Sequence, residues 1–163
     1  MNRILTGVDA KKKLIDGVNL VADIAKVTMG AEGKTVFIER ALDLMPHATK
    51  DGVSAVHAVY GRDAFEEMGV KVVKQATNKV TKDEGDGSSL CTVLTQALVN
   101  RGFEALDNYS HVALNKEIHE THLLIEKEIN KLAKKTDYEN KKYIATISAN
   151  GDEELGKLIA DLY

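Results

Sequence analysis

The sequence has little of several features that mark common classes of protein. It contains a single cysteine, Cys91. A lone cysteine cannot form an internal disulfide, and Cys91 stands in an apolar stretch with helical spacing, which predicts a buried structural thiol. No apolar run approaches the roughly 20 residues that a membrane-spanning helix needs. An internal disulfide and a membrane span are therefore excluded.

An excess of charge of one sign is also lacking. The sequence has 22 basic and 25 acidic side chains, with a formal net charge of -3. Nucleic-acid binders need a basic face, so the composition argues against DNA and RNA as partners. The first residues lack the apolar core and cleavage site of a secretion signal, and we therefore expect a cytoplasmic protein.

What the sequence does have is a globular composition and long stretches of helical periodicity. With 44% hydrophobic and 29% charged residues, 163 residues can bury a hydrophobic core. The apolar spacing predicts a mainly α-helical fold with a small β element. The predicted elements are a helix ending near Met29, a strand at 35–38, a loop around Pro46, a short helix after Gly52, and longer helices beginning near Phe65, Ser88 and Ser110.

Two of the predicted helices carry an apolar stripe that we expect to be buried. The first of them can be capped by Ser88 or Ser89, and Gly102 is expected to mark its end. The two stripes are Leu90, Val93, Leu94, Ala97 and Leu98 in this helix, and Leu114, Ile118, Ile125, Ile129 and Leu132 in the next.

The composition changes beyond Lys135. A polar run at 134–142 separates the helical body from the residues that follow. We therefore predict a first domain over 1–135 and the start of a second over 136–163.

The second segment has weaker signals. Tyr143–Ile147 is consistent with either a strand or a buried helical turn, and Asp152 can cap a last helix. No glycine, proline or polar exit follows Tyr163, so we expect that the sequence is truncated within a longer protein.

The sharpest local feature is a glycine-rich run between two predicted helices, Gly85-Asp86-Gly87-Ser88-Ser89. Two glycines let the backbone approach a ligand closely, and the start of the next helix offers free N–H groups to an anion. Asp86 supplies a carboxylate of the kind that Mg²⁺ accepts beside nucleotide phosphates, and the serines add hydroxyls. The run predicts a phosphate site, although a structural turn containing Asp-Gly would have the same sequence.

Two other segments have compatible chemistry. Residues 28–33 end a helix with glycines whose N–H groups can face phosphate, and Lys50 presents a compact positive charge. Asp51 can orient water or cap the helix that follows. Neither segment is a Walker A loop or a Rossmann glycine motif, so the two common nucleotide-binding folds are excluded.

In order and spacing these segments resemble the group I (GroEL-type) chaperonins. The family patterns are T-L-G-P-x-G, T-K-D-G-V-S-V, F-E-N-M-G and A-G-D-G-T-T-T, and their counterparts here are Thr28 to Gly33, Thr49 to Val56, Phe65 to Gly69 and Glu84 to Leu90. Further counterparts, near R-G-V-N, I-S-A-N-x-D and G-K-L-I-A, lie at 16–19, 147–152 and 156–160. The resemblance therefore covers nearly the whole chain.

The resemblance implies a helical bundle, the N-terminal half of a chaperonin equatorial domain, over 1–135, and the start of the intermediate domain over 136–163. It also implies ATP and Mg²⁺ as cofactors, with Asp86 as the metal ligand and Asp51 as the catalytic carboxylate. The nucleotide contacts that it implies are Thr28, Met29, Gly30, Ala31, Lys50, Gly52, Asp86, Gly87, Ser88, Ser89 and Leu90.

For the whole protein, the resemblance implies an ATP-dependent chaperone that assists protein folding as a ring homo-oligomer. Unfolded substrate proteins and a co-chaperonin would bind an apical domain that this sequence lacks, as it lacks the second half of the equatorial domain. That half holds a second catalytic aspartate, so we expect ATP turnover only in the full-length parent. The alternative for this chain is a non-catalytic helical oligomerisation or interaction module.

Several positions depart from the family pattern. Ala31 replaces a proline, Ser88 and Ser89 replace threonines, and Leu90 removes the third hydroxyl of the loop. Residues 110–113 stand where the family has an M-N-P turn. We interpret the chain as a divergent member, with a viral source as one hypothesis.

Overall fold

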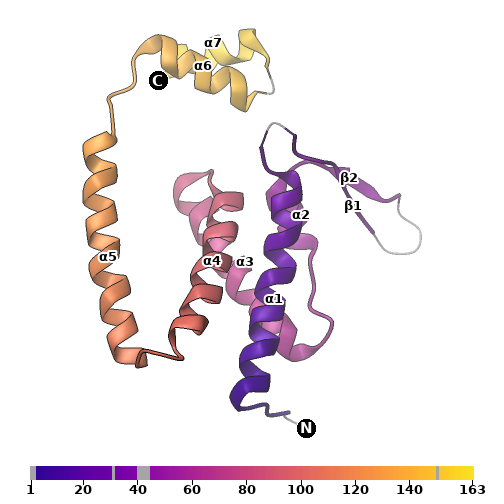
Figure 1. Ribbon diagram of the computed structural model, residues 1–163. Helices are drawn as coiled ribbons and strands as arrows, with labels where there is room; N and C mark the ends of the chain where they lie inside the picture. Colours follow the sequence, from indigo (N-terminus) through magenta and orange to yellow (C-terminus); the bar gives the residue numbers. More distant parts are fainter. Residues whose placement is uncertain (1–2, 31, 40–44, 150) are drawn as a thin grey trace. The chain divides into compact units, whose positions relative to one another are not determined.

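The computed structural model describes residues 3–30, 32–39, 45–149 and 151–163. Within these ranges the protein is mainly α-helical with one small β-sheet, as the sequence predicts (Figure 1). The chain divides into two compact units, Met1–Leu114 and Asn115–Tyr163. The domain boundary near residue 135 stays a prediction. The elements are α1 (Gly7–Thr28), β1 (Val36–Ile38), β2 (His47–Thr49), α2 (Gly52–Ala58), α3 (Ala64–Glu84), α4 (Ser88–Ala105), α5 (His111–Leu132), α6 (Tyr138–Ser148) and α7 (Glu153–Leu162).

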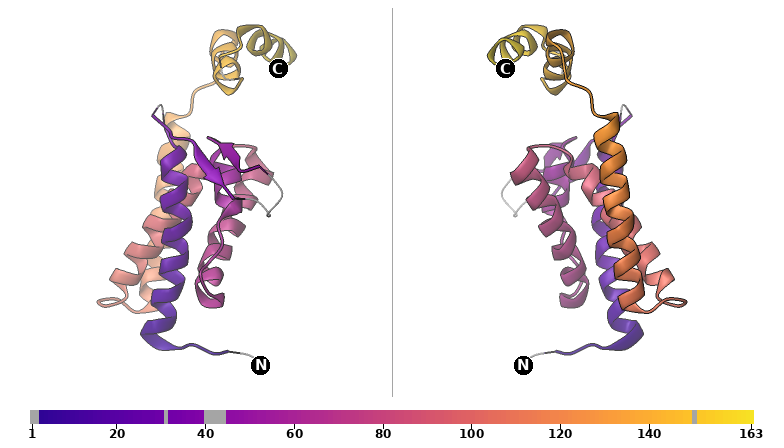
Figure 2. Two further views of the ribbon diagram at one scale, coloured as in Figure 1. Left: turned by 90° about the vertical axis from the view of Figure 1, so that its right-hand side faces the viewer. Right: turned by 90° about the vertical axis from the view of Figure 1, so that its left-hand side faces the viewer.

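The first unit is built on α1, α3 and α4, which lie side by side, with α2 packed on α1 (Figures 1 and 2). β1 pairs antiparallel with β2, with Val36 opposite Thr49. β2 replaces part of the loop predicted around Pro46, because three residues are too few to show an alternating pattern. The core consists of small and β-branched side chains: Val18, Val21, Ala25, Val56, Val59, Val70 and Val73.

α1 and α3 touch through two glycines. A Cβ atom at Gly17 would overlap the Glu66 carbonyl oxygen and come within 2.9 Å of the Val70 nitrogen. One at Gly69 would overlap the Leu14 carbonyl oxygen and lie 3.1 Å from Gly17 Cα. Backbone lies against backbone here, so the contact sets both the spacing of the two helices and their register.

We expect Gly17→Ala and Gly69→Ala each to destabilise the protein by about 2 kcal/mol or more, because backbone must move to admit the methyl group. Gly102 is a matched control, since it lies within α4 where the described residues leave open space for a Cβ atom. Gly102→Ala should stabilise the protein by about 0.5–1 kcal/mol. Urea denaturation measures both effects, and a Gly69→Ala variant as stable as wild type would contradict the close contact.

α4 buries a polar face, so the apolar face predicted for it is wrong. The buried residues of the helix are Ser88, Thr92 and Gln96. Gln96 Nε2 donates to Asn19 Oδ1 at 2.8 Å and to Asp23 Oδ1 at 3.0 Å. Directional hydrogen bonds to α1, rather than apolar packing, therefore decide which side of α4 faces inward.

The leucines of the predicted stripe lie on the surface instead. Leu90, Leu94 and Leu98 are 55%, 53% and 64% exposed, and we call these three residues the α4 leucine strip. Cys91 is half-buried rather than buried, and α4 continues past Gly102, which the sequence predicted as its end. Helical periodicity showed correctly that the leucines share a face but not that this face is uncovered.

In the second unit, α6 and α7 form a helical hairpin. A Cβ atom at Gly156 would overlap the Thr146 hydroxyl, so the two helices meet closely at this glycine. The Asp152 side chain caps α7 by accepting a backbone N–H, as predicted. Tyr143–Ile147, left open between strand and helix, is helical.

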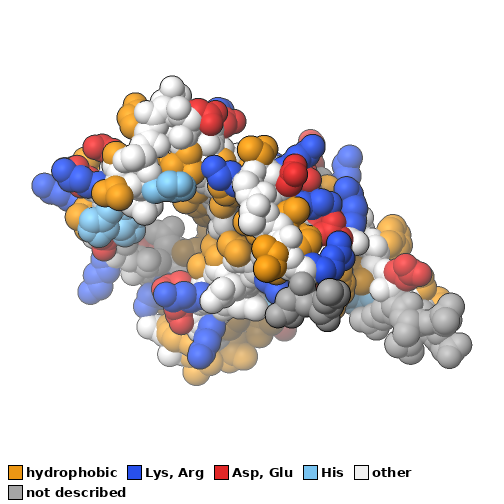
Figure 3. Space-filling view, turned by 90° about the horizontal axis from the view of Figure 1, so that it is seen from below, with side chains coloured by type: hydrophobic (Ala, Val, Ile, Leu, Met, Phe, Trp, Pro, Cys, Tyr) orange, Lys and Arg blue, Asp and Glu red, His pale blue; other side chains and the backbone are white. Residues whose placement is uncertain are grey.

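The surface of the described helices mixes apolar with charged side chains. In α5, Leu114 is half-buried and the other members of the predicted inward stripe are exposed, so that prediction is wrong as well. Acidic and basic side chains intermingle with hydrophobic ones on the face drawn in Figure 3.

None of the helices in the described ranges combines the length and hydropathy that crossing a bilayer requires.

Candidate functional site

Three segments that are distant in sequence line one pocket of about 500 Å³ in the first unit. They are the end of α1, the entry to α2 and the loop between α3 and α4. Every predicted contact within the described residues is among the lining residues, while Ala31 lies outside the described residues. The lining residues are Thr28, Met29, Gly30, Lys50, Asp51, Gly52, Val53, Gly85, Asp86, Gly87, Ser88, Ser89 and Leu90.

Gly52 is the point at which the three segments meet. The residue is buried, and a Cβ atom on it would overlap Ser89 Oγ and lie 3.1 Å from Thr28 Oγ1. Thr28 Oγ1 is itself held by donating to Ala25 O at 2.8 Å. Only glycine allows this approach, which explains why a glycine opens α2.

The loop between α3 and α4 leaves the N-terminus of α4 open. Gly85 (φ +77°) ends α3 and Gly87 (φ +83°) occupies the N-cap position of α4, both in the left-handed region that favours glycine. The predicted capping by Ser88 or Ser89 is therefore wrong, since both lie in the first turn of the helix. Among the described residues no side chain caps α4, and its first three N–H groups, with the positive end of the helix dipole, are available to an anion.

Asp51 caps α2, which is one of the two roles that the sequence predicts for it. Its carboxylate accepts from Val53 N at 3.2 Å, from Ser54 N at 2.8 Å and from Ser54 Oγ at 2.6 Å. Partial burial alone would raise the pKa of Asp51, but the hydrogen bonds from Ser54 and Val53 together lower the pKa below its usual value. Asp51 is therefore ionised at neutral pH, and its catalytic role stays a prediction.

Asp86 and Lys50 are two further exposed charged residues that line the pocket. Asp86 Oδ1 accepts from Gly87 N at 2.6 Å, which leaves the second carboxylate oxygen for another partner. Lys50 is exposed at the entry to α2. Val53 also lines the pocket and was not among the predicted contacts, because an apolar residue at the start of a short helix has no signal that separates it from the core.

Comparison with known proteins identifies the class to which the fold belongs. No model of a known protein family matches the sequence. Similar solved structures are chaperonins, which confirms for the fold the resemblance that the motifs indicate.

Two of these structures are crystal forms of the chaperonin gp146 from the bacteriophage EL 2 (Pseudomonas aeruginosa), both in the presence of ATP-BeFx. Each matches with a TM-score of 0.80 and 24% sequence identity over 96% of this chain. The chain spans 28% of the length of those proteins.

We expect Gly52→Ala to destabilise the protein by about 1–3 kcal/mol, because the new methyl group overlaps the Ser89 hydroxyl. Ser89→Ala removes that hydroxyl. The double variant should therefore lose less stability than the sum of the losses in the two single variants. Urea denaturation of the four proteins measures the coupling. Strictly additive effects would show that Gly52 and Ser89 do not touch.

Proposed function

We propose that this chain binds the phosphate groups of ATP, together with Mg²⁺, as the nucleotide-binding part of a chaperonin. The observation that carries the proposal is the convergence of three segments on Gly52. It brings the open N-terminus of α4 and the positive charge of Lys50 to one pocket. Backbone N–H groups at a helix N-terminus, a lysine and close-packed glycines are together the elements of a phosphate site.

The charges that line the pocket suit a metal-bound nucleotide better than a free anion. Lys50 is opposed by two carboxylates, Asp51 and Asp86. The carboxylates repel a free polyphosphate, whereas a divalent cation held between Asp86 and the phosphate oxygens neutralises that repulsion. The described residues contain no cluster of three or more histidine, cysteine or acidic side chains, so phosphate oxygens and water would complete the coordination, as is usual for Mg²⁺.

Asp51 is proposed as the carboxylate that orients the attacking water in the full-length parent. Its lowered pKa keeps it ionised, and its three hydrogen bonds to the first turn of α2 fix its direction. A carboxylate with two oxygens has about four acceptor positions, so one remains for water. The same contacts make Asp51 a helix cap, and the two roles are compatible.

For the whole protein we propose an ATP-dependent chaperone that assembles as a ring of identical subunits. Binding of unfolded proteins and of a co-chaperonin belongs to the same proposal. The motif resemblance and the phage chaperonin structures support it, and the phage origin also supports the hypothesis of a viral source.

A second candidate function is a non-catalytic helical interaction module. The observation that favours it is the α4 leucine strip, which exposes three large apolar side chains on one helix face. Leu90 belongs to this strip and also lines the pocket, where it supplies no hydroxyl for phosphate.

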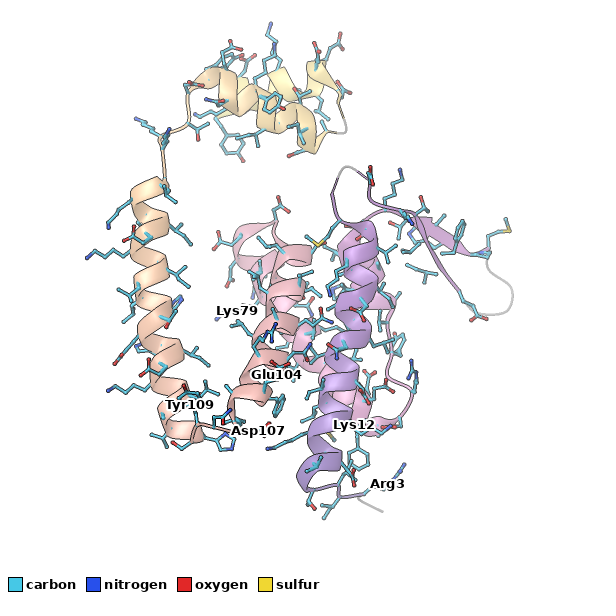
Figure 4. The ribbon with its side chains drawn as sticks, viewed as in Figure 1. Arg3, Lys12, Lys79, Glu104, Asp107 and Tyr109 are labelled. Atoms are coloured by element: carbon cyan, nitrogen blue, oxygen red, sulfur yellow. The ribbon has the colours of Figure 1, made fainter. Side chains whose placement is uncertain are left out.

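We expect isothermal titration calorimetry to detect Mg-ATP binding to this chain. The double variant Lys50→Ala, Asp86→Ala should lower the affinity at least about tenfold, because it removes a charge-assisted hydrogen bond and the metal carboxylate. The matched control is Lys12→Ala, Asp107→Ala, which makes the same charge changes at the opposite end of the first unit (Figure 4). Equal loss in both double variants would contradict the site, and no binding to wild type would favour the interaction module.

Asp51→Asn separates capping from catalysis. Asparagine caps helices about as well as aspartate, so we expect stability within about 0.5 kcal/mol of wild type, against a loss of about 1 kcal/mol for Asp51→Ala. In the full-length parent, Asp51→Asn should reduce ATP turnover about 100-fold or more, because the amide is a poor base. Turnover at the wild-type rate would leave Asp51 as a helix cap alone.

A further inference from the structure

One turn along α4 from the pocket, α3 and α4 meet through a pair of threonines. Thr77 and Thr92 are completely buried, and their hydroxyl oxygens lie 3.0 Å apart. Thr77 Oγ1 also lies 2.9 Å from Val73 O, and Thr92 Oγ1 lies 2.9 Å from Ser88 O. The pair therefore connects the packing of the two helices to the first residue of α4.

The two hydroxyls have fewer protons than these contacts require. Each hydroxyl can donate only one hydrogen bond, and three contacts are within hydrogen-bonding distance. Two arrangements keep a proton between the hydroxyl oxygens. In the first, Thr77 donates to Thr92 and Thr92 donates to Ser88 O. In the second, Thr92 donates to Thr77 and Thr77 donates to Val73 O, so that Ser88 O loses the hydroxyl.

A planar peptide group links the bond to Ser88 O with the pocket. The C=O of Ser88 and the N–H of Ser89 belong to one trans peptide unit, so a force that turns the carbonyl also turns the N–H. A threonine hydroxyl that bonds to the carbonyl four residues earlier bends a helix locally. Ser89 lines the pocket, and its N–H is one of the open donors of α4.

We infer that Thr92 is a positioning residue, whose hydroxyl holds the Ser88–Ser89 peptide so that the Ser89 N–H points at a phosphate group in the pocket. In the second arrangement Thr77 accepts the Thr92 proton and so opposes this orientation. The inference rests on the proposed function, because it concerns how the same pocket holds phosphate.

Two matched substitutions test the inference, since Thr92→Val and Thr77→Val each replace one hydroxyl of the same buried pair by a methyl group. Thr92→Val should weaken Mg-ATP binding by about threefold to tenfold, which corresponds to one hydrogen bond. Thr77→Val leaves Ser88 O as the acceptor for Thr92, so binding should be unchanged or tighter. Thr92→Ser keeps the hydroxyl and should bind within about twofold of wild type. Calorimetry on the four proteins measures the affinities.

Weakening of equal size in the two valine variants would overturn the inference, because a general loss of packing would not distinguish them. So would wild-type affinity in Thr92→Val. If Thr92→Val does not fold, the other two variants decide: weakened binding in Thr77→Val or in a folded Thr92→Ser overturns it.

A measurement without nucleotide separates this inference from the proposed function. In the ligand-free chain, the Ser89 backbone amide signal in ¹H–¹⁵N NMR spectra should move more in Thr92→Val than in Thr77→Val. If it does while wild type binds no Mg-ATP, the proposed function fails and the positioning of the peptide stands. An amide signal that moves in neither variant would overturn the positioning.

Discussion

The contact between α1 and α3 at Gly17 and Gly69 is the constraint on which the candidate pocket depends. The two helices meet backbone to backbone at this point. α1 ends at Thr28, and α3 ends just before Gly85, so both helices lead from the contact to the pocket. Close-packed protein interiors transmit strain. The spacing of α1 and α3 at this contact therefore influences the width of the pocket, although the contact lies outside the pocket.

α4 is held in this frame by a different kind of interaction. Its hydrogen bonds to Asn19 and Asp23 and the contact between Thr77 and Thr92 all lie on its polar side. Hydrogen bonds depend on angle as well as distance, so they fix the rotation of the helix about its axis more sharply than apolar contacts would. This rotation turns Ser88 inward and leaves Leu90 on the surface at the edge of the pocket.

Much of this structure follows from local sequence. The end of α1 near Met29, the start of α3 near Phe65 and the glycine-rich loop between α3 and α4 were predictable because periodicity and turns are properties of neighbouring residues. The buried side of α4 was not, since Gln96 finds its partners on α1, and no local pattern reveals a pair so far apart. Most residues of the pocket were also predictable from sequence motifs, with Val53 as an exception. That these residues meet at Gly52 depends on how α2 packs on α1, which no local pattern reveals.

The position of Leu90 has a thermodynamic consequence. It is a member of the α4 leucine strip and also a wall of the pocket, so a protein surface that covers the strip and a ligand in the pocket would share one side chain. Two binding equilibria that share a group are linked, and the linkage is reciprocal: whatever factor the ligand imposes on the affinity for the covering surface, that surface imposes on the affinity for the ligand. Assembly and occupancy of the pocket would then form one coupled equilibrium rather than two independent ones.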